Sequence, residues 1–233
     1  MNVLVVDVGG THVKLFATRG SRKARFDSGE ALTPPDLVSQ VEATTHDWEY
    51  DVVSLGVPAA VDERGVRTEP GNLGNGWVGV DFGAAFGKPV RVVNDAVLQA
   101  IGGYRGRRML FLGLGTGLGS ALVTEHVVVP LELGSLPDCG KRTMADAVGA
   151  DALDRLGRPQ WLANVHRVTD VLRQGLSADY VVIGGGNARY VEPLPPHALR
   201  GENEDAFHGG VRLWEDVVEP HDRRPARVWR VVR

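Results

Sequence analysis

The chain has little cysteine, with Cys139 alone among 233 residues. One cysteine cannot form an intrachain disulfide, and it excludes a zinc site built mainly from cysteines. No apolar run approaches the roughly 20 residues of a membrane-spanning helix. The first residues enter an apolar run without a charged leader or a signal core. We therefore expect a protein of the reducing cytoplasm, with no membrane partner and no structural zinc.

An excess of one charge sign is also lacking. Lys and Arg total 26 and Asp and Glu total 29, for a net charge of −3, so the sequence gives no overall sign of a nucleic-acid partner. The seven histidines are scattered without the spacing of metal ligands. A hydrophobic content of 43% and a charged content of 24% are typical of a soluble globular protein. The length suits one large or two small cores, and a homodimer is compatible with the sequence.

The chain contains an internal repeat, in residues 3–18 (VLVVDVGGTHVKLFAT) and 108–124 (RMLFLGLGTGLGSALVT). Each copy joins two apolar runs through a glycine-threonine step, which predicts a β-hairpin with a glycine-rich tip. Glycine allows positive φ and close backbone approach, so main-chain N–H groups and a threonine hydroxyl can converge on phosphate oxygens. Two such tips indicate a site that holds a phosphate chain from both sides. The duplication of the hairpin also indicates two domains.

Carboxylates distinguish the copies and suggest the chemistry. Only the first copy carries an aspartate, Asp7, beside its tip, and Mg²⁺ takes oxygen ligands while sharing phosphates and waters. Asn94 and Asp95 stand at a predicted strand-to-helix junction. Asp95 is either a helix cap or a general base facing a substrate hydroxyl, with Asn94 holding a neighbouring hydroxyl. With Mg²⁺ and a phosphate cradle, these parts suit phosphoryl transfer.

A third glycine-rich turn, residues 184–187 (GGGN), follows a predicted strand. Its backbone at Gly185 and Gly186 could approach a nucleotide, or it could simply pack a turn tightly on the strand. The spacing matches neither the dinucleotide fingerprint nor the P-loop. The sequence therefore leaves the use of a nucleotide open.

Hydrophobic patterns predict an α/β protein. Strands are expected at 23–28, 51–57, 90–93, 127–130 and 180–183, helices at 34–46, 81–86, 94–104, 145–156 and 160–176, a turn within 61–68 and a loop at 69–77. Beyond residue 193 the pattern is weak, with a helix over 206–217 and a strand over 227–232. The basic segments 19–25 and 105–108 are either solvated turns or a track for a long phosphate chain.

Six motifs in order, DVGGTHVK, PGN, VNDA, LGLGTGLG, ELG and VIGGG, resemble those of the ROK (repressor, open reading frame, kinase) sugar kinases. The sequence around GGGNAR most resembles that of polyphosphate glucokinases. The resemblance covers about residues 3 to 214. It implies the two-domain actin-like, ribonuclease H-like ATPase fold with a central cleft, divided into 1–95 and 96–233. It also implies transfer of a phosphoryl group from ATP or polyphosphate to the 6-hydroxyl of a hexose, with glucose expected first.

Carried over position by position, the resemblance makes Asp95 the base for the sugar 6-hydroxyl and Asp7 the residue that assists Mg²⁺ through water. The sugar ligands that it implies are Asn72, Asn94 and Glu132. The implied phosphate ligands are Gly9, Gly10, Thr11, Lys14, Gly115, Thr116 and Gly117, and Gly185 and Gly186 lie on the side of a nucleotide, if one is used.

Two departures stand against this pattern. Ser135 replaces a histidine of the family's E-x-G-H motif, and a lost buried hydrogen-bond partner costs about 1–3 kcal/mol. The family's Cys/His zinc cluster and the sugar-binding glutamate near it are missing; Cys139 is a remnant of the cluster at best, and Asp146 is a candidate substitute for the glutamate. The alternative is therefore a non-catalytic sugar- or nucleotide-binding protein that retains the kinase fold.

Overall fold

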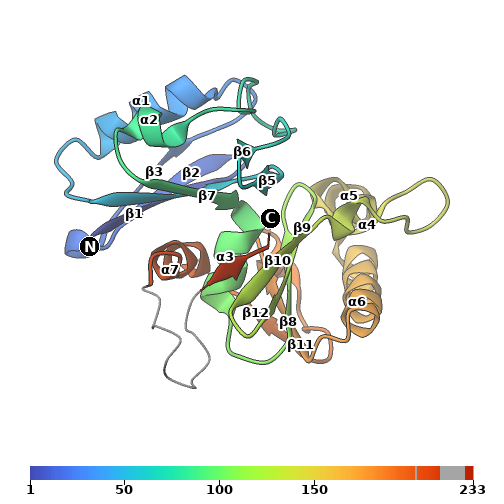
Figure 1. Ribbon diagram of the computed structural model, residues 1–233. Coiled ribbons are helices and arrows are strands. Elements are labelled where there is room, and N and C mark those ends of the chain that lie inside the picture. Colours follow the sequence, from blue (N-terminus) through green and yellow to red (C-terminus); the bar gives the residue numbers. More distant parts are fainter. Residues whose placement is uncertain (203, 216–228, 233) are drawn as a thin grey trace, which may run out of the picture.

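Two sheets form the framework of the molecule, and the computed structural model describes residues 1–202, 204–215 and 229–232. The first sheet has the strand order β3-β2-β1-β4-β7, and the second has the order β12-β11-β8-β9-β10-β13 (Figure 1). The first contains β1 Val3–Val8, β2 His12–Ala17, β3 Arg22–Asp27, β4 Val52–Val57 and β7 Val90–Asn94. The second contains β8 Met109–Leu114, β9 Leu118–Thr124, β10 Val127–Leu131, β11 Tyr180–Gly184, β12 Ala198–Arg200 and β13 Arg230–Val231.

Both repeated segments are hairpins, as the sequence predicts. β1 pairs antiparallel with β2, and β8 pairs antiparallel with β9, each across a glycine-rich tip. β4 and β7 then join β1 as parallel strands. A small hairpin of β5 Val61–Asp62 and β6 Gly65–Val66 confirms the turn predicted within 61–68.

The first sheet is covered on both faces, which explains its continuous apolar strands. All residues of β1 and β4 are buried, as expected for parallel pairing with both sides covered. Leu4 and Val6 belong to the apolar cluster on one face, which α1 Pro34–Thr44 and α2 Phe82–Phe86 cover. Val3 and Val5 belong to the cluster on the opposite, inner face, formed with α3 Asp95–Gly103 and α7 Asp205–Arg212 (Figure 1).

On the second sheet, α4 Met144–Val148, α5 Ala150–Leu156 and α6 Arg158–Gly175 cover the outer face (Figure 1). The prediction of one helix over 145–156 is wrong, because the backbone becomes extended at Gly149, with ψ of 176°. A Cβ at Gly149 would lie 2.4 Å from the Thr116 carbonyl oxygen, so the chain breaks where it meets the second hairpin. In α6, the residues buried against the sheet include Trp161, Val165, Val168 and Leu172, whereas Val171 is 51% exposed.

Helices α3 and α7 cross between the two sheets with their backbones in contact. A Cβ at Gly102 of α3 would lie 1.9 Å from the Asp205 carbonyl oxygen, and one at Gly209 of α7 would lie 1.8 Å from that of Leu98. Only glycine permits so close a crossing. The same helices contribute to one apolar cluster that joins the two sheets. This cluster contains residues from both sides of the predicted domain boundary. The division into residues 1–95 and 96–233 stays a prediction.

The region beyond residue 193 is only partly as expected. The helix predicted over 206–217 is α7, which ends at Arg212, and the strand predicted over 227–232 is the short β13. Residues 216, 217, 227 and 228 of those two predictions lie outside the described residues. None of the helices in the described ranges has the length and apolar character needed to span a bilayer.

Candidate active site

The tip of the first hairpin is held by its own backbone and by Ser28. Gly9 N donates to the His12 carbonyl at 3.0 Å, and Ser28 Oγ donates to the Gly9 carbonyl at 2.6 Å. A Cβ at Gly10 would lie 3.4 Å from Asn72, so the predicted sugar loop contacts this tip. The structure thus brings Asn72 to the first tip, with its side chain exposed.

The second tip, residues 115–117, is held from two sides. Asn187 Nδ2 and Ala150 N both donate to the Gly115 carbonyl, at 3.3 and 3.0 Å. Gly185 has φ of +81°, and a Cβ there would lie 2.4 Å from the Leu114 carbonyl oxygen. The Gly185–Gly186 turn therefore lies against the base of this tip. Asn187 and Ala150 were not recognised from sequence as its supports.

Asp95 begins α3, at the junction predicted for it. The cap of this helix is Asn94, whose Oδ1 accepts from Ala96 N at 2.9 Å while its Nδ2 donates to the Ala59 carbonyl at 3.1 Å. Asp95 Oδ1 also accepts from Ala96 N, at 2.8 Å. Asp95 is therefore not needed as the cap.

A glycine in β4 lets Asp95 approach Asp7. Gly56 is the β4 partner of Asp7, and a Cβ there would lie 2.4 Å from Leu98 of α3 and 3.5 Å from the Asp95 Cα. The absence of a side chain at Gly56 thus allows α3 to pack tightly on the inner face of the sheet. The sequence signal, a glycine within a buried strand, was present but was not recognised.

The charges of two other carboxylates act on Asp95. Burial raises the pKa of Asp95 to about 7, and the negative charges of Asp7 and Glu132 act in the same direction. Burial also raises the pKa of Asp7, which is 6% exposed, against the opposing charge of Lys14, whose Nζ lies 3.6 Å from Asp7 Oδ2. A carboxyl group with a pKa near 7 suits acid–base work at neutral pH.

Glu132 reaches this group from the second sheet. It is exposed, and it precedes a 3₁₀ turn, Leu133–Ser135. Ser120 Oγ supports the turn by donating to the Leu131 carbonyl at 2.8 Å and accepting from Leu133 N at 3.2 Å. Ser135 is exposed at the end of the turn.

The loop after this turn is fixed by an ion pair. Arg167 donates to both carboxylate oxygens of Asp138, at 2.6 and 2.8 Å. Within the described ranges, no three His, Cys, Asp or Glu side chains come together as metal ligands. Asp146 is exposed in the first turn of α4, where it forms a capping box with Thr143 and accepts from Thr143 N, a bond that lowers its pKa. Its role as a substitute sugar ligand stays a prediction.

The basic segment 105–108 lies at the wrong end of β8 to reach the second tip. β8 begins at Met109, directly after this segment, whereas the tip follows its other end at Leu114. Six strand residues span about 20 Å. Arg107 pairs instead with Asp179 at 3.0 Å. The prediction that this segment extends the phosphate site is therefore wrong.

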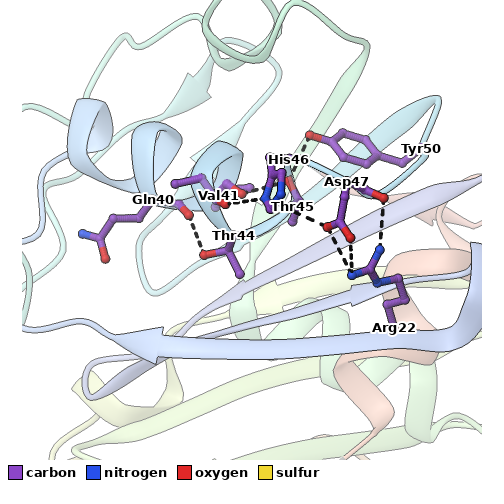
Figure 2. Close-up of polar contacts among 9 residues, drawn as sticks. Arg22, Gln40, Val41, Thr44, Thr45, His46, Asp47 and Tyr50 are labelled. Atoms are coloured by element: carbon purple, nitrogen blue, oxygen red, sulfur yellow. Dashed lines mark hydrogen bonds and ion pairs between the residues drawn. The ribbon is translucent and has the colours of Figure 1, made fainter.

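Most of segment 19–25 is also remote from its tip, because it connects the far end of β2 to β3. Figure 2 shows Arg22 there, bonded to the Asp47 carbonyl at 3.0 Å and to its carboxylate at 2.9 and 3.1 Å. Arg25 differs, since it pairs in register with Lys14 of β2. Only this end of the segment lies beside the candidate site.

The chain has the actin-like fold of the ROK-family sugar kinases, as the sequence resemblance predicts. The inorganic polyphosphate/ATP-glucomannokinase of Arthrobacter sp. strain KM has a TM-score of 0.78 and 21% identity, covering 89% of this chain and 96% of that chain. The ROK hexokinase of Thermus thermophilus has a TM-score of 0.64 and 20% identity, covering 90% of this chain and 96% of that chain.

A curated relative matches part of the chain in sequence. The bifunctional enzyme NanE/NanK of Brucella melitensis is 31% identical over 170 residues, which make up 66% of this chain and 32% of the relative. The chain thus spans about a third of the length of the curated relatives it matches. No family model matches the chain.

Proposed function

We propose that this protein is a hexose kinase that transfers a phosphoryl group from ATP or polyphosphate to the 6-hydroxyl of glucose. The observation that carries the proposal is the pKa of Asp95, raised to about 7 beside Asp7. The two glycine tips and an actin-like fold support the same activity. The name of the Arthrobacter relative includes both ATP and polyphosphate, which supports either compound as the donor.

The residues divide the work as follows. Asp95 accepts the proton of the sugar hydroxyl, and Oδ2 is the atom that does so, because Oδ1 is bonded to Ala96 N. Deprotonation of the hydroxyl as it attacks phosphorus makes the oxygen a better nucleophile. The sugar hydroxyls are bound by Asn72, Asn94 and Glu132. The phosphates are held by Gly9, Gly10, Thr11, Lys14, Gly115, Thr116 and Gly117, with Gly185 and Gly186 on the nucleotide side.

The donor set of Asp7 fits Mg²⁺. Proteins hold this ion through one or two carboxylates, with waters and substrate phosphates completing its shell. Asp7 is a buried carboxylate whose pKa stays raised by burial although Lys14 lies beside it, and a cation would offset more of its charge. When bound, Mg²⁺ neutralises phosphate charge. Asp7 would hold it through water, and Lys14 offers a second positive charge beside the same phosphates.

The non-catalytic alternative is not favoured. A binding protein needs no carboxyl group poised between its two protonation states, yet Asp95 is kept so by burial and by two neighbouring carboxylates. Ser135 in place of histidine bears on sugar affinity rather than on proton transfer. We therefore expect weaker sugar binding, not loss of chemistry.

A coupled assay of purified protein against glucose, mannose and N-acetylmannosamine, each with ATP and with polyphosphate, tests the proposal. The expected result is formation of glucose 6-phosphate with at least one donor, dependent on Mg²⁺. A control without sugar measures hydrolysis of the donor. If every hexose failed to turn over while sugar binding was measurable by calorimetry, the protein would be a binding protein instead.

The pKa of Asp95 also predicts a pH profile. The base works only when deprotonated, so kcat/KM is expected to fall about tenfold per pH unit below about pH 7 and to level off above it. Initial rates between pH 5 and 9, with coupling enzymes in excess throughout, would measure this. A profile that stays flat down to pH 5 would contradict a base with a raised pKa.

A further inference from the structure

We propose that Glu69 is a positioning residue for sugar binding: its carboxylate closes the loop that presents Asn72 to the sugar. This inference rests on the proposed function, in which Asn72 binds a sugar hydroxyl. Glu69 itself lies at the start of the loop and touches no reacting group. Its role is to hold the loop backbone.

The contacts of Glu69 join the two ends of the loop. Oε2 accepts from Gly76 N and from Trp77 N, each at 3.0 Å, and Oε1 accepts from Val78 N at 3.3 Å. One carboxylate thus binds three successive backbone N–H groups, seven to nine residues further along the chain. Bonds to an ionised acceptor are roughly twice as strong as neutral ones.

Asn72 lies within the ring that these bonds close. On one side, Asn72 packs against the first tip, since a Cβ added at Gly10 would lie 3.4 Å from its side chain. On the other side, Gly74 N donates to the Leu32 carbonyl at 3.0 Å. Trp77 anchors the far end of the loop, because it is fully buried in the outer apolar cluster.

Apart from the burial of Leu73 and Trp77, the loop has few contacts that order its backbone. Residues 69–78 form no helix or strand, and they contain Gly71, Gly74 and Gly76. Glycine loses more conformational freedom on ordering than other residues, so such a loop is entropically costly to fix. Among the side chains of residues 69–78, all of which are described, Glu69 alone hydrogen-bonds to the backbone of the loop. Without this carboxylate, the N–H groups of Gly76, Trp77 and Val78 would lose their acceptor and could bond only to water.

The test compares Glu69→Ala and Glu69→Gln with Glu63→Ala as the matched control. Glu63 is an exposed glutamate in the turn between β5 and β6. Glutamine keeps one oxygen that can accept from Gly76 N and Trp77 N but loses the bond to Val78 N. We expect Glu69→Ala to raise the Kd and KM for glucose about tenfold, Glu69→Gln to raise them less, and Glu63→Ala to leave both unchanged.

Two further readouts separate positioning from general damage. In Glu69→Ala, kcat and the KM for the donor should stay within about threefold of wild type, because Asp95 and the tips are untouched. Amide hydrogen exchange should accelerate at residues 76–78 and not in β1 or α3. A parallel loss of kcat, glucose affinity and melting temperature would overturn the inference, since it would indicate unfolding.

The failure of this inference is distinguishable from failure of the proposed function. Calorimetry on the wild type comes first. If the wild type binds glucose and Glu69→Ala binds it equally well, the inference is overturned and the kinase proposal stands. If the wild type binds no hexose with either donor present, the proposed function fails, and with it the sugar role of Glu69.

Discussion

Replacing Asp95 with asparagine is expected to lower kcat by about 10²–10⁴-fold, the range for losing a general base. Asparagine has nearly the same shape and still offers an oxygen to Ala96 N, but it cannot accept the proton of the hydroxyl. The helix cap is not at stake, because Asn94 provides it. The coupled assay measures the loss. Activity within threefold of wild type would show that Asp95 does not act as the base.

The same variant should be more stable than wild type at neutral and alkaline pH. The pKa of Asp95 is raised from 3.8 to about 7 in the folded protein. As pH rises, the unfolded chain therefore releases this proton at a lower pH than the folded protein does. Wild-type stability therefore falls as pH rises between about 4 and 7, and asparagine removes that loss. Thermal melts should show Asp95→Asn above wild type at pH 8 and equal to it near pH 4. A variant that is both inactive and less stable at pH 8 would indicate structural damage.

The second large effect concerns the helix crossing. Gly209→Ala is expected to lower the free energy of unfolding by about 3 kcal/mol or more, because its Cβ would lie 1.8 Å from the Leu98 carbonyl oxygen. Backbone cannot move aside as a flexible side chain can, so α7 and α3 must separate. For a chain of this size the melting temperature should fall by about 6–12 °C.

Gly175→Ala is the matched control for that change. Gly175 ends α6, and a Cβ there would have no atom within 4 Å. Alanine is the better helix former, so we expect a neutral or slightly stabilising effect, within about 1 kcal/mol. Equal melting temperatures for the two alanine variants would show that the crossing tolerates a wider separation than its contacts indicate.

The sequence predicted those elements whose signals are local. The two hairpins, α1 and the buried strand β4 follow from alternation, turn residues and continuous apolar runs. Gly149 shows the limit, because nothing in residues 145–156 reveals that the Thr116 carbonyl occupies the space beside it. The prediction that the basic segments lie beside the phosphate site was wrong for the same reason. Residues that adjoin a hairpin in the chain lie at the opposite end of its strands in space.

The candidate site was predictable where it depends on side-chain chemistry. Asp7 and Asp95 belong to recognisable motifs, and the structure places them within electrostatic reach of each other. Gly56 and Glu69 were missed because their contribution is to backbone approach and backbone hydrogen bonding. Such contributions depend on partners brought close only by folding.

The return of α7 to the first sheet also bears on the order of events during synthesis. Ser54 Oγ donates to the Gly210 carbonyl at 2.6 Å, across 156 positions of sequence. The strands of the first sheet therefore leave the ribosome long before the helix that covers their inner face. Until then, Val3 and Val5 lack part of their cover, and an uncovered apolar face is prone to aggregation. Packing of α7 thus completes the cover of this apolar face.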